Sequence, residues 1–458
     1  MSALPKFKQP AQYNLFPEAQ QYHHLDKWGY FSLLTRNSMG KTAQSSHRLD
    51  TMPTVLGLVD PHQDTWLSQA EFMRPNRRVV NLLRVGLLFC DIDCYPKDKQ
   101  DPALTQWAQG KSPEAMAQAL LYFCQLEGIP APSVVVFSGR GLQVKWLLEG
   151  TIPRQALPRW NACQRHLVDK LRPYGADPAA KDASRVLRLV DTVNTRSGEI
   201  CRVVHVTPGN DGQAVRYSFE ELAEYLLPVA RWKHEAKQAE AQERRKHFQL
   251  LQGGRKPGAG LRRFSDQALA WHRLEDLRTL AQMRGGVAEG ERMQHLFWQL
   301  NFMLLSGATN SGDMWHEAAE LARQIDSGWG YRSPELSTLY SKAKAYEAGE
   351  KVTFKGRELA PLYTPRNDTL INLFGITDDE QKKLRTIIST SEAKGRHAKR
   401  TEASRRAAGA IERAAYLGQA QDKRTQALEL RAQGKSWAEV AQAVGYKSAD
   451  SARIACRP

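Results

Sequence analysis

The sequence contains no apolar run that approaches the roughly 20 residues needed to span a bilayer, and its mean hydropathy is −0.54. Its first residues, Met-Ser-Ala-Leu-Pro-Lys, lack the apolar stretch of a signal peptide. The six cysteines are scattered and none forms a C-x-x-C pair, which argues against a structural zinc site. We therefore expect a cytoplasmic protein with reduced cysteines and no membrane association.

A complete phosphate-binding loop is also missing. Gly40, Lys41 and Thr42 resemble the end of that motif, but its earlier glycine would stand at position 35, which is Thr35. The chain therefore lacks a P-loop helicase motor. We expect a replicative helicase, where unwinding is needed, to be a separate protein.

Positive charge is abundant. The 458 residues include 65 lysines and arginines against 49 aspartates and glutamates, a formal net charge of +16. This balance favours a polyanionic partner, most simply nucleic acid. The length suffices for two or three domains.

The N-terminal half alternates strand and helix patterns, which predicts an α+β domain over residues 1–230. The expected strands are Leu82–Ile92, Ser133–Phe137, Leu142–Leu148 and Arg202–Thr207. A charged helical linker is predicted over residues 231–262, since this stretch is rich in Ala, Glu, Lys, Arg and Gln and is then broken by glycines.

The C-terminal half is predicted to be helical. Residues 263–395 are expected to form an accessory domain, with apolar core positions at Leu296, Phe297, Leu300, Phe302, Met303 and Leu304. Residues 396–458 combine a basic segment with a helix-turn-helix pattern, in which Ser436 and Glu439 form a capping box. The residues expected to face DNA phosphates are Lys447, Arg453 and Arg457; a small bundle that binds protein, or nothing, is the alternative.

Two aspartates stand at the end of an apolar strand. In Leu87–Asp93, Asp91 and Asp93 are two residues apart, so they point to one face with Cα atoms roughly 6–7 Å apart. Two carboxylates at this spacing can both reach a divalent cation, which would offset their mutual repulsion. A strand that simply ends in solvent is the other interpretation.

The next segment, Val134–Trp146, predicts a hairpin whose turn is Ser-Gly-Arg-Gly. Two glycines in a tight turn let backbone amides approach a phosphate, and Arg140 can pair with a triphosphate. Gln143 and Lys145 share one face of the return strand. A third segment, Gly175–Asn194, adds Asp177 and Asp182 with the basic residues Arg185 and Arg188; an ordinary hairpin and a polar loop are the alternatives for these two segments.

Taken in order, D-x-D, then S-G-x-G with a polar strand, then an acid followed by R-x-x-R-L and T-x-N, these segments resemble the archaeo-eukaryotic primase superfamily. The likeness is greatest to primases of plasmids, phages and integrative elements. The stretch Asp64–Ser68, with Phe72 and Arg77-Arg78, resembles the lead-in of that group. The resemblance covers residues 60–210 well and the helical region after them less specifically.

The resemblance implies an RRM-like catalytic core in a DNA primase or primase-polymerase of a plasmid or other mobile element. It further implies Mg²⁺ or Mn²⁺, NTP or dNTP substrates and a single-stranded DNA template, with origin duplex DNA as a further partner. Asp91 and Asp93 match the metal-binding acids, and Asp177 or Asp182 the third acid; Asp177 is preferred because it opens its segment as the family's acid does. The residues that match the nucleotide-binding motifs are Ser138, Gly139, Arg140, Gly141, Arg185, Arg188 and Asn194.

One position departs from the family pattern, which usually has a histidine where this chain has Gln143. A glutamine donates a hydrogen bond to phosphate but carries no charge. Lys145 is a candidate for the missing positive charge, and His205 is a second, although a core histidine is its simpler interpretation. If neither contributes, the site is slow or degenerate.

Two other functions fit parts of the sequence. A replication initiator that binds origin DNA through its C-terminal helices, and does no chemistry, is the main alternative. A nuclease or nicking enzyme is the second, since D-x-D also suits phosphodiester cleavage. His23-His24 does not support it, because the spacing of a relaxase motif is missing.

Overall fold

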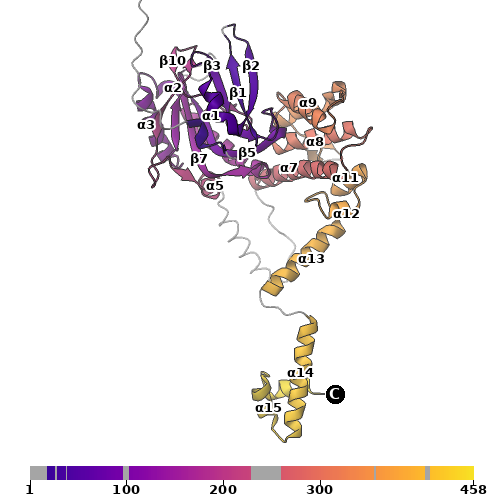
Figure 1. The fold of residues 1–458 in the computed structure, drawn as a ribbon. Coiled ribbons are helices and arrows are strands. Elements are labelled where there is room, and N and C mark those ends of the chain that lie inside the picture. Colours follow the sequence, from indigo (N-terminus) through magenta and orange to yellow (C-terminus); the bar gives the residue numbers. More distant parts are fainter. Residues whose placement is uncertain are drawn as a thin grey trace, which may run out of the picture. The chain divides into compact units, whose positions relative to one another are not determined.

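The computed structural model describes residues 18–25, 28–37, 39–95, 103–227, 259–354, 357–407 and 413–457. The chain forms two compact units (Figure 1), residues 1–365 with 384–386, and residues 366–383 with 387–458. The four-part domain division drawn from the sequence stays a prediction, and most of its linker, 231–262, lies outside the described residues.

A ten-stranded, mainly antiparallel sheet forms the centre of the first unit (Figure 1), in the order β11-β6-β7-β5-β4-β1-β3-β8, with β2 beside β1 and β12 beside β7. Its strands are β1 (Tyr30–Arg36), β2 (Thr42–Arg48), β3 (Asp64–Ser68), β4 (Ala70–Phe72), β5 (Leu82–Asp93), β6 (Val134–Phe137), β7 (Gly141–Pro153), β8 (Val186–Arg188), β11 (Arg202–Val206) and β12 (Arg216–Tyr217). Two short strands, β9 (Val193–Asn194) and β10 (Glu199–Ile200), pair separately. The four strands expected from the sequence are all present, and β7 is longer than predicted.

The sheet splits beside β5, and this split creates the candidate site. Strands β3 and β4 follow each other along one edge of β1. On their other edge, β4 pairs with the start of β5, whereas β3 pairs with β8. The register between β5 and β7 shifts after Val85, where the pairing of β5 with β4 ends. The far end of β5 pairs with β7 and with the segment around Ala176. The third sequence segment therefore lies between β5 and β3.

Helices pack around this sheet. They include α3 (Pro113–Leu126), which begins at the predicted N-cap Ser112, and α4 (Leu157–Leu171); the shorter ones are α1 (Met52–Gly57), α2 (Ala103–Gln106) and α5 (Phe219–Leu226). Helix α4 is tied to β5 because Trp160 Nε1 donates to the Leu87 carbonyl at 2.9 Å. The buried amide of Gln164 bonds both main-chain groups of Phe89. These contacts fix the strand that carries Asp91 and Asp93.

Within the first unit, a helical region packs on α4 and on the short turn Val79–Asn81 that precedes β5. It contains α7 (Ala259–Met283), α8 (Arg292–Ser306), α9 (Met314–Ile325), α10 (Ser337–Glu347) and the hairpin β13 (Val352–Phe354) and β14 (Arg357–Leu359). Glu317 of α9 accepts hydrogen bonds from the N–H groups of Val79 and Val80, each at 3.0 Å. Arg278 of α7 donates to the Val80 carbonyl at 2.8 Å. The helical region is thus joined to the core by buried ionisable side chains.

Glu317 is expected to make the stability of this unit fall as the pH rises from about 4.5 to about 7. Burial raises the pKa of Glu317 to about 7, although hydrogen bonds from Val80 and Val79 and the charge of Arg78 lower it. Because the folded protein holds this proton more tightly than the unfolded chain does, the stabilisation is complete below pH 4.5 and is lost as the pH rises through 7. The change is on the order of 3 kcal/mol.

Urea unfolding of wild type and Glu317→Gln at pH 5 and pH 8 measures this effect. Other groups titrate in both proteins, so the difference between their pH dependences reports Glu317. Wild type should lose more free energy of unfolding than the variant between the two pH values. Equal losses would show that the carboxyl titrates normally.

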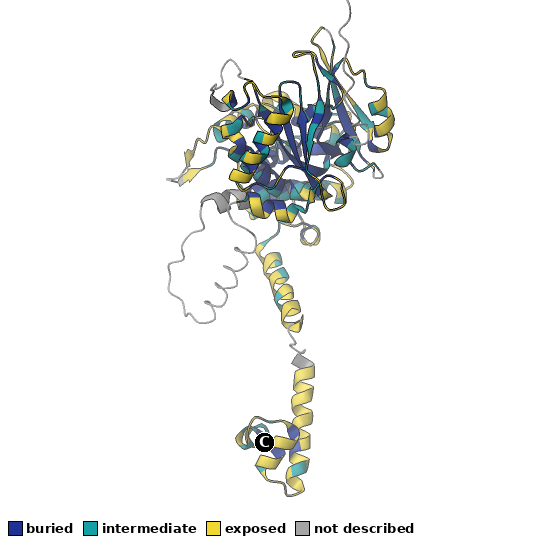
Figure 2. Cartoon of the chain, turned by 90° about the vertical axis from the view of Figure 1, so that its left-hand side faces the viewer, coloured by how far each residue is buried: buried dark blue, intermediate teal, exposed yellow. Residues whose placement is uncertain are grey.

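The second unit contains α11 (Asn367–Phe374), α12 (Asp378–Gln381), α13 (Thr390–Ala407), α14 (Arg413–Ala432), α15 (Trp437–Val444) and α16 (Ala449–Ala455). Ser436 and Glu439 form the predicted capping box of α15, and Ser448 caps α16. The core of the last three helices is small and consists of Ala427, Val440, Ala441, Val444 and Ala452. Helix α13, which carries the basic segment, has no buried residue among those described, and Figure 2 shows it and most of α14 exposed.

Among the described residues, no helix is both long and apolar enough to cross a membrane. The predicted α+β fold is confirmed, and the region after the sheet is helical apart from the hairpin β13–β14.

Candidate active site

Asp91 and Asp93 stand side by side on the open face of β5. The register places Asp91 opposite Gln143 and Asp93 opposite Gly141 on β7. Both aspartates are half-buried. Cys90 points to the other face, where burial, and then the charge of Asp91, raises the pKa of its thiol well above the usual value. The strand therefore separates an apolar layer from a face that presents two carboxylates.

The Ser138–Gly141 turn is tight and needs its glycines. The Ser138 N–H donates to the Gly141 carbonyl at 2.9 Å, and the Ser138 hydroxyl donates to the same oxygen at 3.1 Å. Gly139 has a φ of +89°, and a Cβ there would lie 2.7 Å from Asn194 Cβ. A Cβ at Gly141 would collide with the Ile92 carbonyl. Asn194 in turn donates to the Ser138 carbonyl at 2.8 Å, so the turn and the third segment are held together.

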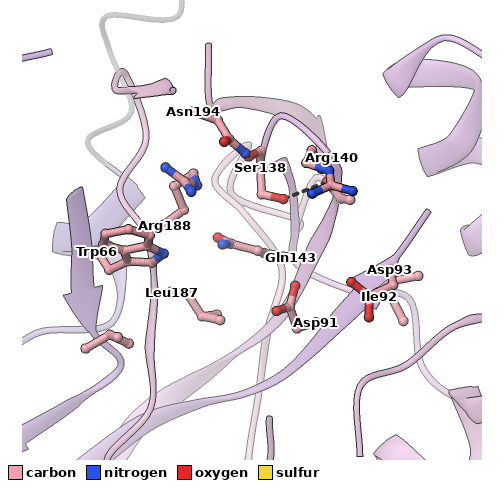
Figure 3. Close-up of a pocket in the computed structure, with 12 residues that line it drawn as sticks. Trp66, Asp91, Ile92, Asp93, Ser138, Arg140, Gln143, Leu187, Arg188 and Asn194 are labelled. Carbon is pink, nitrogen blue, oxygen red and sulfur yellow. Dashed lines mark hydrogen bonds between the residues drawn. The ribbon is translucent and has the colours of Figure 1, made fainter. Parts of the chain in front are cut away.

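These groups line one open cavity of about 180 Å³. Its polar lining residues are Trp66, Asp91, Asp93, Ser138, Arg140, Gln143, Arg188 and Asn194. Figure 3 shows Asp91 and Gln143 directed into the same space, with Arg188 and Trp66 across it. The structure therefore brings residues from all three sequence segments together.

A second cavity of about 190 Å³ shares Asp93, Arg140, Arg188 and Asn194 with the first. Its lining adds two further arginines, Arg36 and Arg196, with Asp64 and Tyr95. Four arginines thus face two aspartates, and one of those aspartates is already paired with Arg188 at 2.5 Å. The net positive charge of this lining suits a phosphate-rich anion.

Asp64 holds the arginine side of the site in place. It is buried, pairs with Arg188, and accepts from the Thr195 N–H at 3.1 Å and the Thr195 hydroxyl at 2.6 Å. Burial raises the pKa of Asp64, but the hydrogen bonds from Thr195 and Arg188 outweigh it, so the pKa lies below its usual value. The Arg188 guanidinium also lies 4.6 Å from the Trp66 ring centroid, and that of Arg36 lies 5.2 Å from it.

Lys145 lies outside both cavities. Its side chain is 1% exposed, and its Nζ lies 2.5 Å from Glu18 Oε1 in the short helix η1 (Glu18–Gln21). It also contacts Tyr22, whose ring centroid is 4.7 Å from Nζ. The positive charge of the Lys145 ammonium is therefore balanced by the Glu18 carboxylate inside the protein. Its predicted contribution to a nucleotide site has no support in this arrangement.

The two candidates for a third acid also lie beside the cavity lining rather than in it. Asp177 is the nearer in the fold, since its N–H donates to the Asp91 carbonyl at 2.8 Å. Asp182 is held by Ser184 at 2.7 Å and by Arg185 at 2.8 Å. Asp177 therefore remains the preferred third acid, as a prediction. His205, on β11, bonds the Thr207 hydroxyl at 3.1 Å, and burial lowers its pKa.

The donors present fit a hard divalent cation. In the described part of the chain, no group of three or more His, Cys, Asp or Glu is arranged to hold a metal ion. Mg²⁺, however, is usually bound through one or two carboxylates together with phosphate oxygens and water. Asp91 and Asp93 supply such a pair on a polar, open face.

Four residues of the cavity linings received no site role from the sequence, namely Arg36, Asp64, Trp66 and Arg196. The stretch Asp64–Ser68 was noted only as resembling the family's lead-in, although Asp64 and Trp66 are two residues apart on one strand, as Asp91 and Asp93 are. The two arginines have no such signal. Arg36 lies on β1, and Arg196 follows β9.

No family model matches the chain. A curated replication protein of Clostridium perfringens is 26% identical over 328 residues, which cover 71% of this chain and 69% of that protein. Among solved structures, the AEP domain of the cyanophage S-2L primase-polymerase has a TM-score of 0.31 and 17% identity, over 43% of this chain and 90% of that one. Primase RepB′ has a TM-score of 0.27 and 14% identity, over 68% and 93%.

In sequence, the chain is similar to that replication protein over 71% of its own length.

Proposed function

We propose that the chain is a metal-dependent primase or primase-polymerase that builds primers on single-stranded DNA during the replication of a plasmid or other mobile element. In the reaction, a 3′-hydroxyl oxygen forms a bond to the α-phosphorus of a nucleotide while the bond to the bridging β-phosphate oxygen breaks. Pyrophosphate leaves with its electron pair, and the hydroxyl proton passes to solvent.

One observation supports this proposal above all: the carboxylate pair and the arginine cluster line adjoining cavities that share Asp93, Arg140, Arg188 and Asn194. Nucleotidyl transfer needs a negatively charged group beside the reacting phosphate to hold cations, and positive groups around the departing phosphates. A nucleotide can reach both at once only where the two cavities meet.

The aspartates and the arginines of the site have different roles in this proposal. Asp91 and Asp93 would hold Mg²⁺ or Mn²⁺, which when bound lowers the pKa of the attacking hydroxyl and neutralises phosphate charge. The guanidinium groups of Arg140 and Arg188 would pair with phosphate oxygens. Gly139 and Gly141 let the turn pack against Asn194 and β5, which fixes the backbone that carries Arg140.

Primer synthesis on single-stranded DNA tests the proposal. Purified protein is incubated with an unprimed template, Mg²⁺ or Mn²⁺, and labelled NTPs or dNTPs. Metal-dependent products longer than one nucleotide are expected, and EDTA should abolish them. A protein that yields no product with any nucleotide or metal, yet binds DNA, would fit a non-catalytic initiator.

Arg36→Ala and Arg196→Ala are each expected to raise the KM for nucleotide by roughly 10- to 100-fold. A hydrogen bond between charged groups contributes about 1.5–3 kcal/mol, and each 1.4 kcal/mol corresponds to a factor of ten. Steady-state kinetics with a primed template measures this change. Arg48→Ala is the matched control, because Arg48 lies on β2 and pairs with Asp50 outside both cavities. An unchanged KM in both variants would place the triphosphate elsewhere.

The initiator remains a second candidate, because the last three helices form a capped bundle that carries exposed basic side chains. Lys447, Arg453 and Arg457 are all exposed, although Arg453 pairs with Asp450 at 3.2 Å. Exposed basic groups on a three-helix bundle suit contacts with DNA phosphates. Both functions can belong to one chain, with origin duplex DNA bound by this bundle.

A further inference from the structure

Gln143 is a buried amide at the centre of the candidate active site. It is 3% exposed and lies on β7 between β5 and β6, directly opposite Asp91. A buried amide without hydrogen-bond partners is costly. Its partners are not on the neighbouring strands. They belong to β8, which is separated from β7 by several strands in the order of the sheet.

Gln143 bonds both main-chain groups of one residue on β8. In the orientation that satisfies both amide atoms, its oxygen accepts from the Arg188 N–H at 2.8 Å and its nitrogen donates to the Arg188 carbonyl at 3.3 Å. The pairing of β8 with β3 leaves these two groups available. The bonds to β3 come from the flanking residues, since the Leu189 N–H donates to Thr65 and the Gln69 N–H donates to Arg185.

Arg188 is therefore held from two sides. Asp64 and Trp66 of β3 fix its guanidinium, and Gln143 of β7 fixes its backbone. Strand β8 is only three residues long; Asn194 ties the segment after it to the Ser138–Gly141 turn, whereas Gln143 bonds Arg188 itself. Figure 3 shows Gln143 between Arg188 and Asp91. The Gln143 side chain therefore spans the space between the arginine and the carboxylate pair.

We propose that Gln143 is a positioning residue that holds Arg188 at a fixed place opposite Asp91 and Asp93. This inference rests on the proposed function, since the arginine is taken to bind nucleotide phosphate. A primary amide supplies one donor and one acceptor side by side, which matches the N–H and C=O of a single residue. Gln143 thus acts through Arg188 and does not touch the reacting atoms.

A double-mutant cycle tests whether Gln143 acts through Arg188. Gln143→Met keeps the side-chain length and removes both hydrogen bonds, so it should raise the KM for nucleotide about tenfold. In an Arg188→Ala background the same change should alter KM less than about twofold, because the group that it positions is gone. Equal factors in both backgrounds would overturn the proposal.

Gln143→His separates positioning from direct participation. If residue 143 contacted the nucleotide itself, an imidazole there should raise kcat. If it positions Arg188, the ring cannot bond both main-chain groups in the same way, and kcat/KM should fall. A higher kcat would contradict the proposal.

Hydrogen exchange supplies a readout that does not depend on activity. Peptides that cover residues 186–190 should exchange faster in Gln143→Met than in wild type, while those from β6 should not change. Unchanged exchange at 186–190 would refute the inference even in an active enzyme. Faster exchange in Gln143→Met, together with a wild type that makes no primers, would instead refute the proposed function alone. Gln143→Asn, whose amide is one methylene too short to reach, replaces the methionine variant if the latter does not fold.

Discussion

Replacing Asp91 or Asp93 with asparagine is expected to lower the rate of nucleotide incorporation by about 10³-fold or more and to leave the fold intact. Charge stabilisation by a bound metal contributes several kcal/mol to such transition states, and each 1.36 kcal/mol corresponds to a tenfold change in rate. Asparagine keeps the size of the side chain but loses the negative charge that would hold the cation. Both residues are half-buried on an open face, so the change leaves no cavity in the core.

Primer extension with Mg²⁺ and Mn²⁺, together with thermal unfolding of each variant, measures the two halves of this expectation. Asp50→Asn is a suitable control, since Asp50 is an exposed carboxylate of the same unit and pairs with Arg48 at 2.6 Å. Full synthesis by both Asp91 and Asp93 variants would end the polymerase interpretation. A loss of synthesis accompanied by a lower unfolding temperature would assign the two carboxylates a structural part instead.

The local patterns of the sequence predicted the elements on which the site is built. The strand Leu82–Asp93 follows from its apolar run, and its alternation places Asp91 and Asp93 on one face. The C-terminal helices begin where Ser436 and Ser448 predicted, because an N-cap is decided within three or four residues. Each of these predictions depends only on neighbours along the chain.

Contacts between distant parts of the chain were not predictable in this way. Arg36 joins the site because β1 and β8 flank β3, and no pattern within β1 reports that pairing. Glu317 docks the helical region onto Val79, which lies 238 residues earlier in the chain. The contact of Gln143 was not predictable either. The sequence shows a glutamine where the family it resembles usually has a histidine, and only the folded structure shows that this amide binds Arg188.

Replacing Lys145 is expected to lower the stability of the folded protein strongly. The sequence placed Lys145 on the same face as Gln143 and suggested a role beside the nucleotide. The structure buries its ammonium against Glu18, with the Tyr22 hydroxyl 3.3 Å from Nζ. Glu18 belongs to η1, well over a hundred positions earlier, so the pair fastens the N-terminal segment to the sheet.

Lys145→Met should therefore lower the free energy of unfolding by about 3–5 kcal/mol, because removing one partner leaves the other charge buried and uncompensated. The double variant Lys145→Met with Glu18→Leu should recover most of this loss, since an apolar pair of similar volume often replaces a buried ion pair at little cost. Urea unfolding at pH 7 measures both variants. Where Lys145→Met remains folded, its KM for nucleotide should match wild type. The opposite result would be a Lys145→Met protein that unfolds at the same urea concentration as wild type but has a raised KM for nucleotide. Lys145 would then contact the nucleotide, and the triphosphate would be bound by Lys145 together with the arginines.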